Sequence, residues 1–120
     1  MRMTSNQVLT HSALRTGALL GLSHAEFARA LGLDQSTVSA MADGAAELQG
    51  VTPSGQRAFT MIKIYQSLTA NVGGDEQACK QWVCSHNTGL AATPALLVQS
   101  EDEMNAVLAY LQSMEALQGR

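Results

Sequence analysis

The spacing of apolar residues along the chain predicts helices from one end to the other. Apolar side chains recur at intervals of three and four, and no alternating run of β-branched and aromatic residues lasts six positions. Turn signals separate the apolar segments. The pattern therefore predicts an all-α fold, whose core consists mainly of leucine, alanine, methionine and valine because aromatic residues are only 4% of the chain.

Three short helices are expected in the first part of the chain, over residues 6–20, 23–31 and 34–42. Ser23 and Glu26 have the spacing of a capping box, in which each side chain binds a free amide at the start of a helix. Gly32 can adopt the left-handed backbone that ends the second helix, and Asp34 can cap the third. This order predicts two helices joined by a tight corner.

A connector over residues 45–54, which holds Gly50 and Pro53, marks the expected domain boundary. We predict one helical domain over residues 1–52 and a second over residues 53–120. In the second, helices are expected over residues 54–72 and 75–83, from Thr93-Pro94, and from Ser100 onward, with residues 85–92 irregular. Its apolar surplus and few charges are typical of a dimerisation or partner-binding unit.

Residues 22–44 have the small and apolar positions that a helix-turn-helix needs. Ala28 allows close approach of two helices, Gly32 takes the corner, and Leu33 and Val38 reach the core. This order resembles the Xre-type repressor family. The resemblance implies that the second helix of the motif lies in the major groove of operator DNA.

If the motif binds DNA, the residues expected to contact it lie on and around this second helix. Gln35 can form a bidentate contact to adenine, and hydroxyl and guanidinium groups can contact phosphates or base edges. The expected DNA-binding residues are Gln35, Ser36, Thr37, Ser39, Arg29, Arg15 and Arg57. Two acids and no base occur between Asp34 and Gly44, so we expect a homodimer or larger assembly that places two such helices on one duplex.

A second resemblance involves the C-terminal half of the chain. The run Gly73-Gly74-Asp75-Glu76, the pair Trp82-Val83, Asn87, Thr93-Pro94 and an aliphatic last helix follow one another in order. Together they resemble the C-terminal domain of the MbcA/ParS/Xre antitoxins. Each of these residues also has a purely structural interpretation as a helix cap or core anchor.

The resemblance implies a type II antitoxin. In that family the N-terminal half represses its own operon, and the C-terminal half binds and inhibits a RES-domain toxin that consumes NAD⁺. It further implies that a cation, Arg120 near the end of the chain or alternatively Lys80, interacts with acidic or phosphate-binding parts of the toxin's cleft. The antitoxin itself has no catalytic task.

Composition narrows the remaining function classes. The net charge of −3 is too negative for unselective coating of nucleic acid, and no apolar run of about 18 residues occurs, so we expect a cytoplasmic protein without membrane contact. Cys79 and Cys84 fit neither a zinc site nor a redox pair. The histidines are scattered and no phosphate-binding loop is present. We therefore expect that the protein is not an enzyme and that it binds no cofactor, metal or small-molecule substrate.

Two other functions are compatible with the same residues. One is a free-standing transcriptional regulator without a toxin partner. The other is an adaptor or anti-repressor, whose helix-turn-helix binds protein in place of DNA. The acids around residues 34–44 favour the adaptor, whereas Gln35 with Ser36 and Thr37 favours DNA binding.

Overall fold

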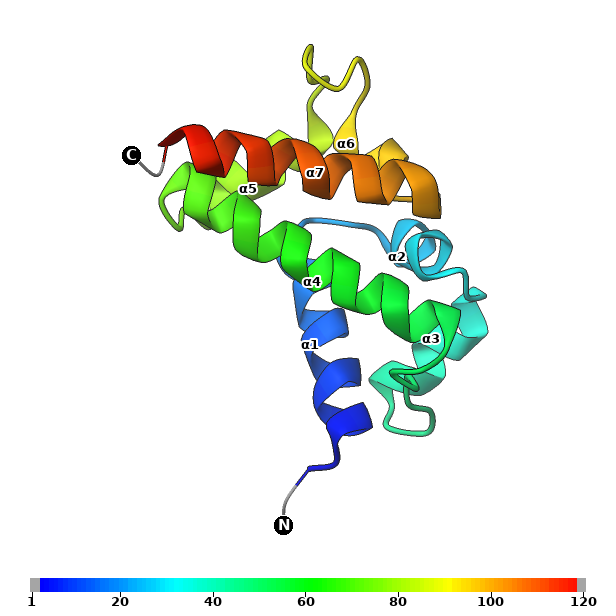
Figure 1. Cartoon of the computed structure of the whole chain (residues 1–120). Helices are drawn as coiled ribbons and strands as arrows, with labels where there is room; N and C mark the ends of the chain where they lie inside the picture. The colour runs from blue at the N-terminus through cyan, green and yellow to red at the C-terminus, as the bar shows by residue number, and fades with distance from the viewer. Residues whose placement is uncertain (1–2, 119–120) are drawn as a thin grey trace.

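The computed structural model describes residues 3–118, which form seven α-helices (Figure 1). The helices are α1 (Ser5–Leu19), α2 (His24–Leu31), α3 (Gln35–Ala42), α4 (Pro53–Val72), α5 (Glu76–Cys84), α6 (Pro94–Leu97) and α7 (Glu101–Gln118). Across these residues no strand forms, and the backbone pairing of Asn87 with Ala92 is an isolated bridge. The prediction of an all-α fold is confirmed.

Side-chain caps define where the N-terminal helices begin. Ser23 accepts a hydrogen bond from the amide of Glu26 at 3.1 Å, and the Glu26 carboxylate accepts one from the Ser23 amide at 2.8 Å. Thr4 and Gln7 form the same reciprocal pair at the start of α1. Since a capping box satisfies two amides that lack helical partners, these helix starts are encoded locally.

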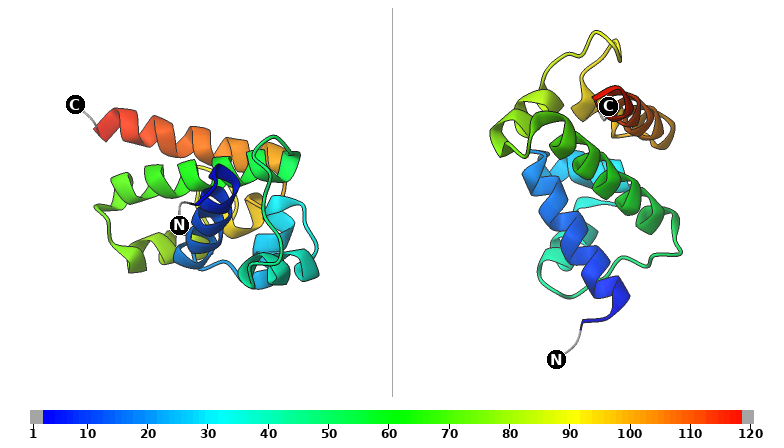
Figure 2. Two further views of the ribbon diagram at one scale, coloured as in Figure 1. Left: turned by 90° about the horizontal axis from the view of Figure 1, so that it is seen from below. Right: turned by 60° about the vertical axis from the view of Figure 1, so that its left-hand side comes forward.

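The longest helix, α4, is the centre of the molecule. It packs against α1 and α2 from the N-terminal half of the chain and against α5 and α7 from the C-terminal half (Figures 1 and 2). Its side chains Met61, Ile64 and Leu68 are almost completely buried. Both halves of the chain therefore share one core helix, and the domain division at residue 52 stays a prediction.

The start of α4 is held against the preceding loop. Thr52 caps the helix by accepting a hydrogen bond from the amide of Gly55 at 3.1 Å, and Pro53 is the first helical residue. Gly55 is buried against the carbonyl of Gln49, and any Cβ at position 55 would overlap that carbonyl. Glycine is thus required here by close backbone approach.

A short loop over residues 85–92 projects from the C-terminal half, away from the other helices (Figure 1). The amide and carbonyl of Asn87 pair with Ala92, and the Asn87 side chain accepts a hydrogen bond from the amide of Leu90 at 3.0 Å. Ala91 has a positive φ of 57°. The segment expected to be irregular is therefore a hydrogen-bonded loop.

No helix between residues 3 and 118 is both long enough and apolar enough to cross a membrane. The longest, α4, has 20 residues, but it contains Arg57 and Lys63 together with several amide and hydroxyl side chains.

Candidate functional site

A tight corner joins α2 to α3. Gly32 has a left-handed backbone with φ of 72°, and the amide of Leu33 donates to the carbonyl of Ala28 at 2.9 Å, which closes α2. Only Leu33 and Asp34 then precede α3, and Asp34 caps that helix through the amide of Thr37 at 2.8 Å. Two eight-residue helices with a three-residue turn have the form of a helix-turn-helix.

The helix pair is fixed to the core by small and apolar residues. Ala28 and Val38 are both buried, which brings α2 and α3 into close contact. On the other side of α2, the ring of Phe27 lies directly on Gly17 of α1: a Cβ at Gly17 would lie 2.7 Å from Cε1 of that ring. The absence of a side chain at residue 17 therefore sets the position of α2 against α1.

Most of the predicted base-contacting residues face solvent. Gln35, Ser36 and Ser39 are exposed on α3, and Thr37 is half-buried. Gln35 and Ser39 are four residues apart and so share one side of the helix. The structure thus brings these polar side chains together on the outer surface of the corner.

The carboxylate of Asp34 holds the first turn of α3. Hydrogen bonds from Thr37, by its side chain and its backbone amide, lower the pKa of Asp34 below its ordinary value, and the Ser36 hydroxyl, 3.0 Å from the carboxylate, adds to the shift. The hydroxyl of Ser36 is therefore already engaged with the cap. Gln35 and Ser39 remain as the α3 side chains best placed for contact with a partner.

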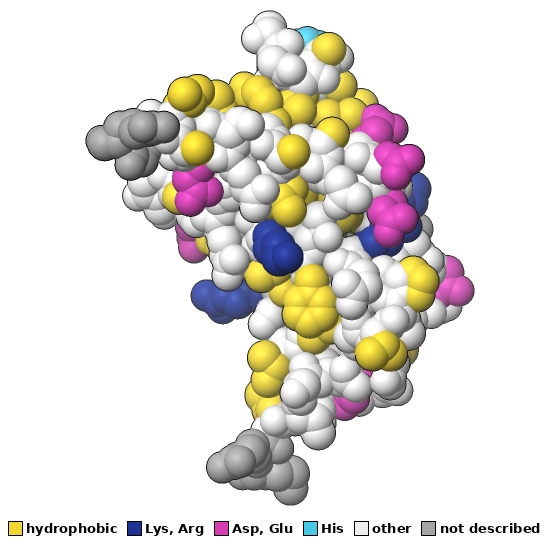
Figure 3. Space-filling model, in the orientation of Figure 1, with side chains coloured by type: hydrophobic (Ala, Val, Ile, Leu, Met, Phe, Trp, Pro, Cys, Tyr) yellow, Lys and Arg dark blue, Asp and Glu magenta, His cyan; other side chains and the backbone are white. Residues whose placement is uncertain are grey.

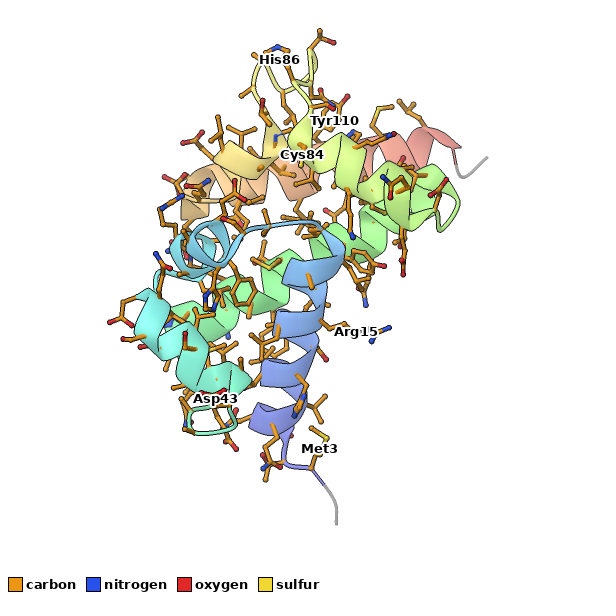
Figure 4. The ribbon with its side chains drawn as sticks, turned by 180° about the vertical axis from the view of Figure 1, so that it is seen from behind. Met3, Arg15, Asp43, Cys84, His86 and Tyr110 are labelled. Carbon is orange, nitrogen blue, oxygen red and sulfur yellow. The ribbon has the colours of Figure 1, made fainter. Side chains whose placement is uncertain are left out.

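The three predicted backbone-binding arginines are not gathered in one place. Arg29 lies in the last turn of α2, where its Nε donates to Gln99 at 2.6 Å, and Arg57 of α4 donates from Nη2 to the Arg29 carbonyl at 3.4 Å. The Arg57 guanidinium also covers Gly32. Arg29 and Arg57 thus lie together at the corner, whereas Arg15 projects from the side of α1 away from α3 (Figure 4).

Arg57 has a structural role that its sequence position did not indicate. A cation beside the carbonyl end of α2 stabilises that helix end through the helix dipole. Its Nε is buried and finds no hydrogen-bond partner among residues 3–118. The contact brings residues 28 positions apart together, so only the tertiary fold reveals it.

In the C-terminal half, two aromatic side chains meet between α5 and α7. The rings of Trp82 and Tyr110 stack with centroids 6.5 Å apart and planes at 26°. Tyr110 also packs on Gly89 of the projecting loop, where a Cβ would lie 2.6 Å from its ring. Hydrophobic side chains gather where this loop meets α7 (Figure 3). Trp82, which was expected to be a core anchor, is half-buried and packs against the core.

Comparison with protein families assigns this half of the chain. The family model of the antitoxin Xre/MbcA/ParS C-terminal toxin-binding domain matches residues 67–116. The matched segment covers the end of α4 and almost all of α5 to α7. Residues 67–116 therefore belong to the toxin-binding domain family of the Xre/MbcA/ParS antitoxins. No curated protein matches the chain.

The antitoxin assignment rests on the C-terminal half alone. The helix pair α2 and α3 lies outside the matched residues. The family points to a regulatory protein that binds a toxin. The predicted resemblance to the MbcA/ParS/Xre family is confirmed.

The two cations predicted to contact the toxin are Arg120 and Lys80. Arg120 lies outside the described residues. Lys80 is exposed on α5, and its aliphatic stem packs over Gly21, which has a positive φ of 76°. Lys80 therefore keeps its charged group in solvent, while its aliphatic stem covers the turn after α1.

The two cysteines of the antitoxin differ in environment. Cys79 is buried and Cys84 is exposed, and both are free. Burial, together with the nearby acids Asp75 and Glu76, raises the pKa of the Cys79 thiol. In the described part of the chain, no three His, Cys, Asp or Glu side chains are grouped so that they could hold a metal ion.

The stack of Tyr110 on Trp82 and the contact of Tyr110 with Gly89 were missed by sequence reasoning. Tyr110 is next to Leu111 on α7, within the apolar stripe, so its position in sequence resembles that of a core residue. A half-exposed tyrosine can be told from a buried one only when its neighbours are known. The one available signal was the glycine of the loop, since Gly89 allows an aromatic ring to approach the backbone closely.

Proposed function

We propose that this antitoxin represses its own operon by binding operator DNA through α3, and neutralises a RES-domain, NAD-degrading toxin through residues 67–116. The observation that supports the DNA-binding part is the three-residue corner at Gly32, which presents Gln35 and Ser39 to solvent on a helix anchored by Val38. The family match supports the toxin-binding part. The antitoxin has no catalytic task in this proposal.

On DNA, α3 enters the major groove with its N-terminal end toward the bases. Gln35 contacts an adenine, Ser39 a base edge, and Ser36 and Thr37 lie beside the nearest phosphates. Arg29 contacts the flanking backbone. Arg57 contributes mainly by holding the corner, and Arg15, which points away from α3, is the weakest of the three candidates.

A homodimer is part of the proposal because one copy has few positive charges near α3 that could bind DNA phosphates. α3 contains no basic residue, and the acids Asp34 and Asp43 lie at its two ends (Figure 4). Two copies bound to neighbouring half-sites, about 34 Å apart along the duplex, double the base contacts and the phosphate contacts together.

The DNA-binding part is tested by titrating the promoter of the antitoxin's own gene at several salt concentrations. Binding is expected to weaken steeply with salt, because phosphate contacts release counterions. Gln35→Ala is expected to cost about 1–3 kcal/mol and to relax preference at one base pair. Arg29→Ala should weaken binding to all DNA sequences alike. It should also reduce the slope of the logarithm of affinity against the logarithm of salt concentration by about one. Gln112→Ala, on the exposed face of α7, is the control.

Absence of binding even at low salt would refute the DNA-binding part. It would favour the adaptor function, for which the acids at both ends of α3 are the specific observation. An adaptor would bind a protein through Gln35 and Ser39.

The toxin-binding part is tested with the neighbouring gene. It should encode a RES-domain protein, and co-expression of the antitoxin should rescue cells from it. If the Arg120→Ala variant still rescues cells, Arg120 is not needed for contact with the toxin. Lys80→Ala tests the second cation in the same way. A neighbouring gene of another kind, with promoter binding intact, would favour a free-standing regulator.

A further inference from the structure

Two hollows adjoin one another on either side of Trp82. The larger, about 290 Å³, lies between α5 and the base of the projecting loop, with Ala78 and the neutral polar side chains of Gln81, Ser85, His86 and Asn87 in its walls. The smaller, about 190 Å³, lies between α4, α5 and α7 and is lined by Asn71, Tyr110 and Met114. Trp82 and Val72 line both. The hollows therefore form one surface with an aromatic ring at its centre.

Every residue that lines these hollows lies within the segment matched by the toxin-binding family. Large side chains that are half-buried at the centre of an apolar depression are the usual anchors of protein interfaces. A second apolar depression, formed by Val8 and Phe59 on α1 and α4, lies outside the matched residues. The family match thus favours the Trp82 hollows over that one as the site of the toxin.

The chemistry of the hollows indicates what fits them. Among the described residues, no Lys, Arg, Asp or Glu lines either hollow, so a charged segment would gain no ion pair there. In the smaller hollow, Asn71 donates from Nδ2 to the carbonyls of Ser67 and Leu111, and its Oδ1 is covered by the protein, so the accessible polar groups are those of the larger hollow. An apolar side chain with an N–H or O–H group matches this environment.

The projecting loop gives the larger hollow a preformed wall. Hydrogen bonds within the loop hold Asn87 against Ala92, and the contact of Gly89 with Tyr110 ties the loop to α7. His86 lies on the loop, above Tyr110 (Figure 4). A wall that is already ordered loses little conformational entropy when a partner binds.

We propose that a neutral, apolar segment of the toxin docks across the two hollows, with a tyrosine or tryptophan of the toxin entering beside Trp82 and hydrogen-bonding to the polar side chains of the larger hollow. This inference rests on the proposed toxin-binding function of residues 67–116 and names the surface that performs it.

The test uses the full antitoxin and a catalytically inactive form of the RES-domain protein encoded beside it. Ala78→Glu places a charge in the larger hollow and Met114→Glu in the smaller, and each is expected to weaken toxin binding at least tenfold in calorimetry. Leu96→Glu is the matched control, because Leu96 is 64% exposed within the same domain and lines neither hollow. Circular dichroism and thermal melting verify that each variant folds.

A second measurement needs no substitution in the hollows. Trp82 is the single tryptophan of the chain, so the antitoxin labelled with 5-fluorotryptophan gives one ¹⁹F resonance from this site. The resonance is expected to shift when toxin binds. Unchanged affinity of both glutamate variants, or a resonance that does not respond to bound toxin, overturns the docking surface and leaves toxin binding intact.

Two further outcomes separate this inference from the function on which it rests. If the unmodified antitoxin does not bind the RES-domain protein, the proposed toxin fails and the docking surface fails with it. If the Trp82 resonance changes on dilution of the antitoxin alone, a second copy occupies the hollows, and the inference is overturned.

Discussion

Replacement of Gly17 by alanine tests how the pair of helices α2 and α3 is attached to α1. A Cβ at residue 17 would lie 2.7 Å from Cε1 of Phe27 and closer still to Cδ1. Ordinary contacts between carbon atoms begin near 3.5 Å, so the ring must retreat by about 1 Å. Phe27 is only 4% exposed, and the one hollow beside it, of about 160 Å³ among the described residues, is lined by Gly17 itself, so the free space for the ring is limited. The substitution therefore overpacks the interface between α1 and α2.

Two opposing effects determine the change in the free energy of unfolding. Overpacking of a core costs about 1–3 kcal/mol. Alanine in place of glycine within a helix stabilises the folded state by about 1 kcal/mol, because alanine has the higher helix propensity. Because the whole ring has to move, the upper part of the first range applies, and we expect a net loss of about 1–2 kcal/mol. For a chain of this size, the melting temperature should fall by about 4–8 °C.

The assay is thermal and urea unfolding of four proteins: the unmodified antitoxin, Gly17→Ala, Phe27→Leu and the double variant. Leucine removes the ring atoms that the new Cβ would meet, so Gly17→Ala should stabilise the Phe27→Leu background although it destabilises the native one. Such a reversal measures the coupling of the two residues directly. Ala18→Gly, at an exposed position of α1, calibrates helix propensity. A higher melting temperature for Gly17→Ala alone would refute the reasoning.

Three further predictions concern the loop, the thiols and a helix cap. Gly89→Ala should lower stability by about 1–3 kcal/mol, because its Cβ meets the ring of Tyr110, and should also weaken toxin binding; urea unfolding and calorimetry measure the two effects. In the folded antitoxin a thiol reagent should modify Cys84 at once and the buried Cys79 only after unfolding, and an equal rate for both would contradict their environments. Since the pKa of Cys79 is raised, its contribution to stability is present at neutral pH and lost as the pH rises through the folded-state value. Since the pKa of Asp34 is lowered, its contribution is present at neutral pH and lost as the pH falls through the folded-state value; Asp34→Asn should keep the cap and remove that acid dependence of α3, measured by amide exchange.

The helix boundaries could be predicted because their determinants are local. Ser23 and Glu26 are three residues apart and satisfy each other's amides, and Gly32 ends α2 through its own backbone conformation. Asp34 needs only the next turn to act as a cap. Thr93 was also expected to cap a helix: it does precede α6, but its side chain accepts no hydrogen bond there. Its position was predictable, and its bonding was not.

The geometry of the candidate sites could not be predicted, because it depends on contacts between distant segments. The bond of Arg29 to Gln99 joins residues 70 positions apart, and the approach of Arg57 to the end of α2 depends on how α4 crosses that helix. The hollows beside Trp82 exist only once α4, α5 and α7 are packed. A sequence pattern indicates which face of a helix is apolar, but not which part of that face stays uncovered.

The shared helix α4 has a consequence for how the antitoxin is broken down. A protease that cuts the connection before α4 does not release two working pieces, because α1 and α2 remain packed on α4. The N-terminal and C-terminal halves are joined rigidly, because the continuous helix α4 packs against both of them. Damage to that helix, such as a polar substitution at the buried Leu68, should therefore unfold the N-terminal and C-terminal halves together.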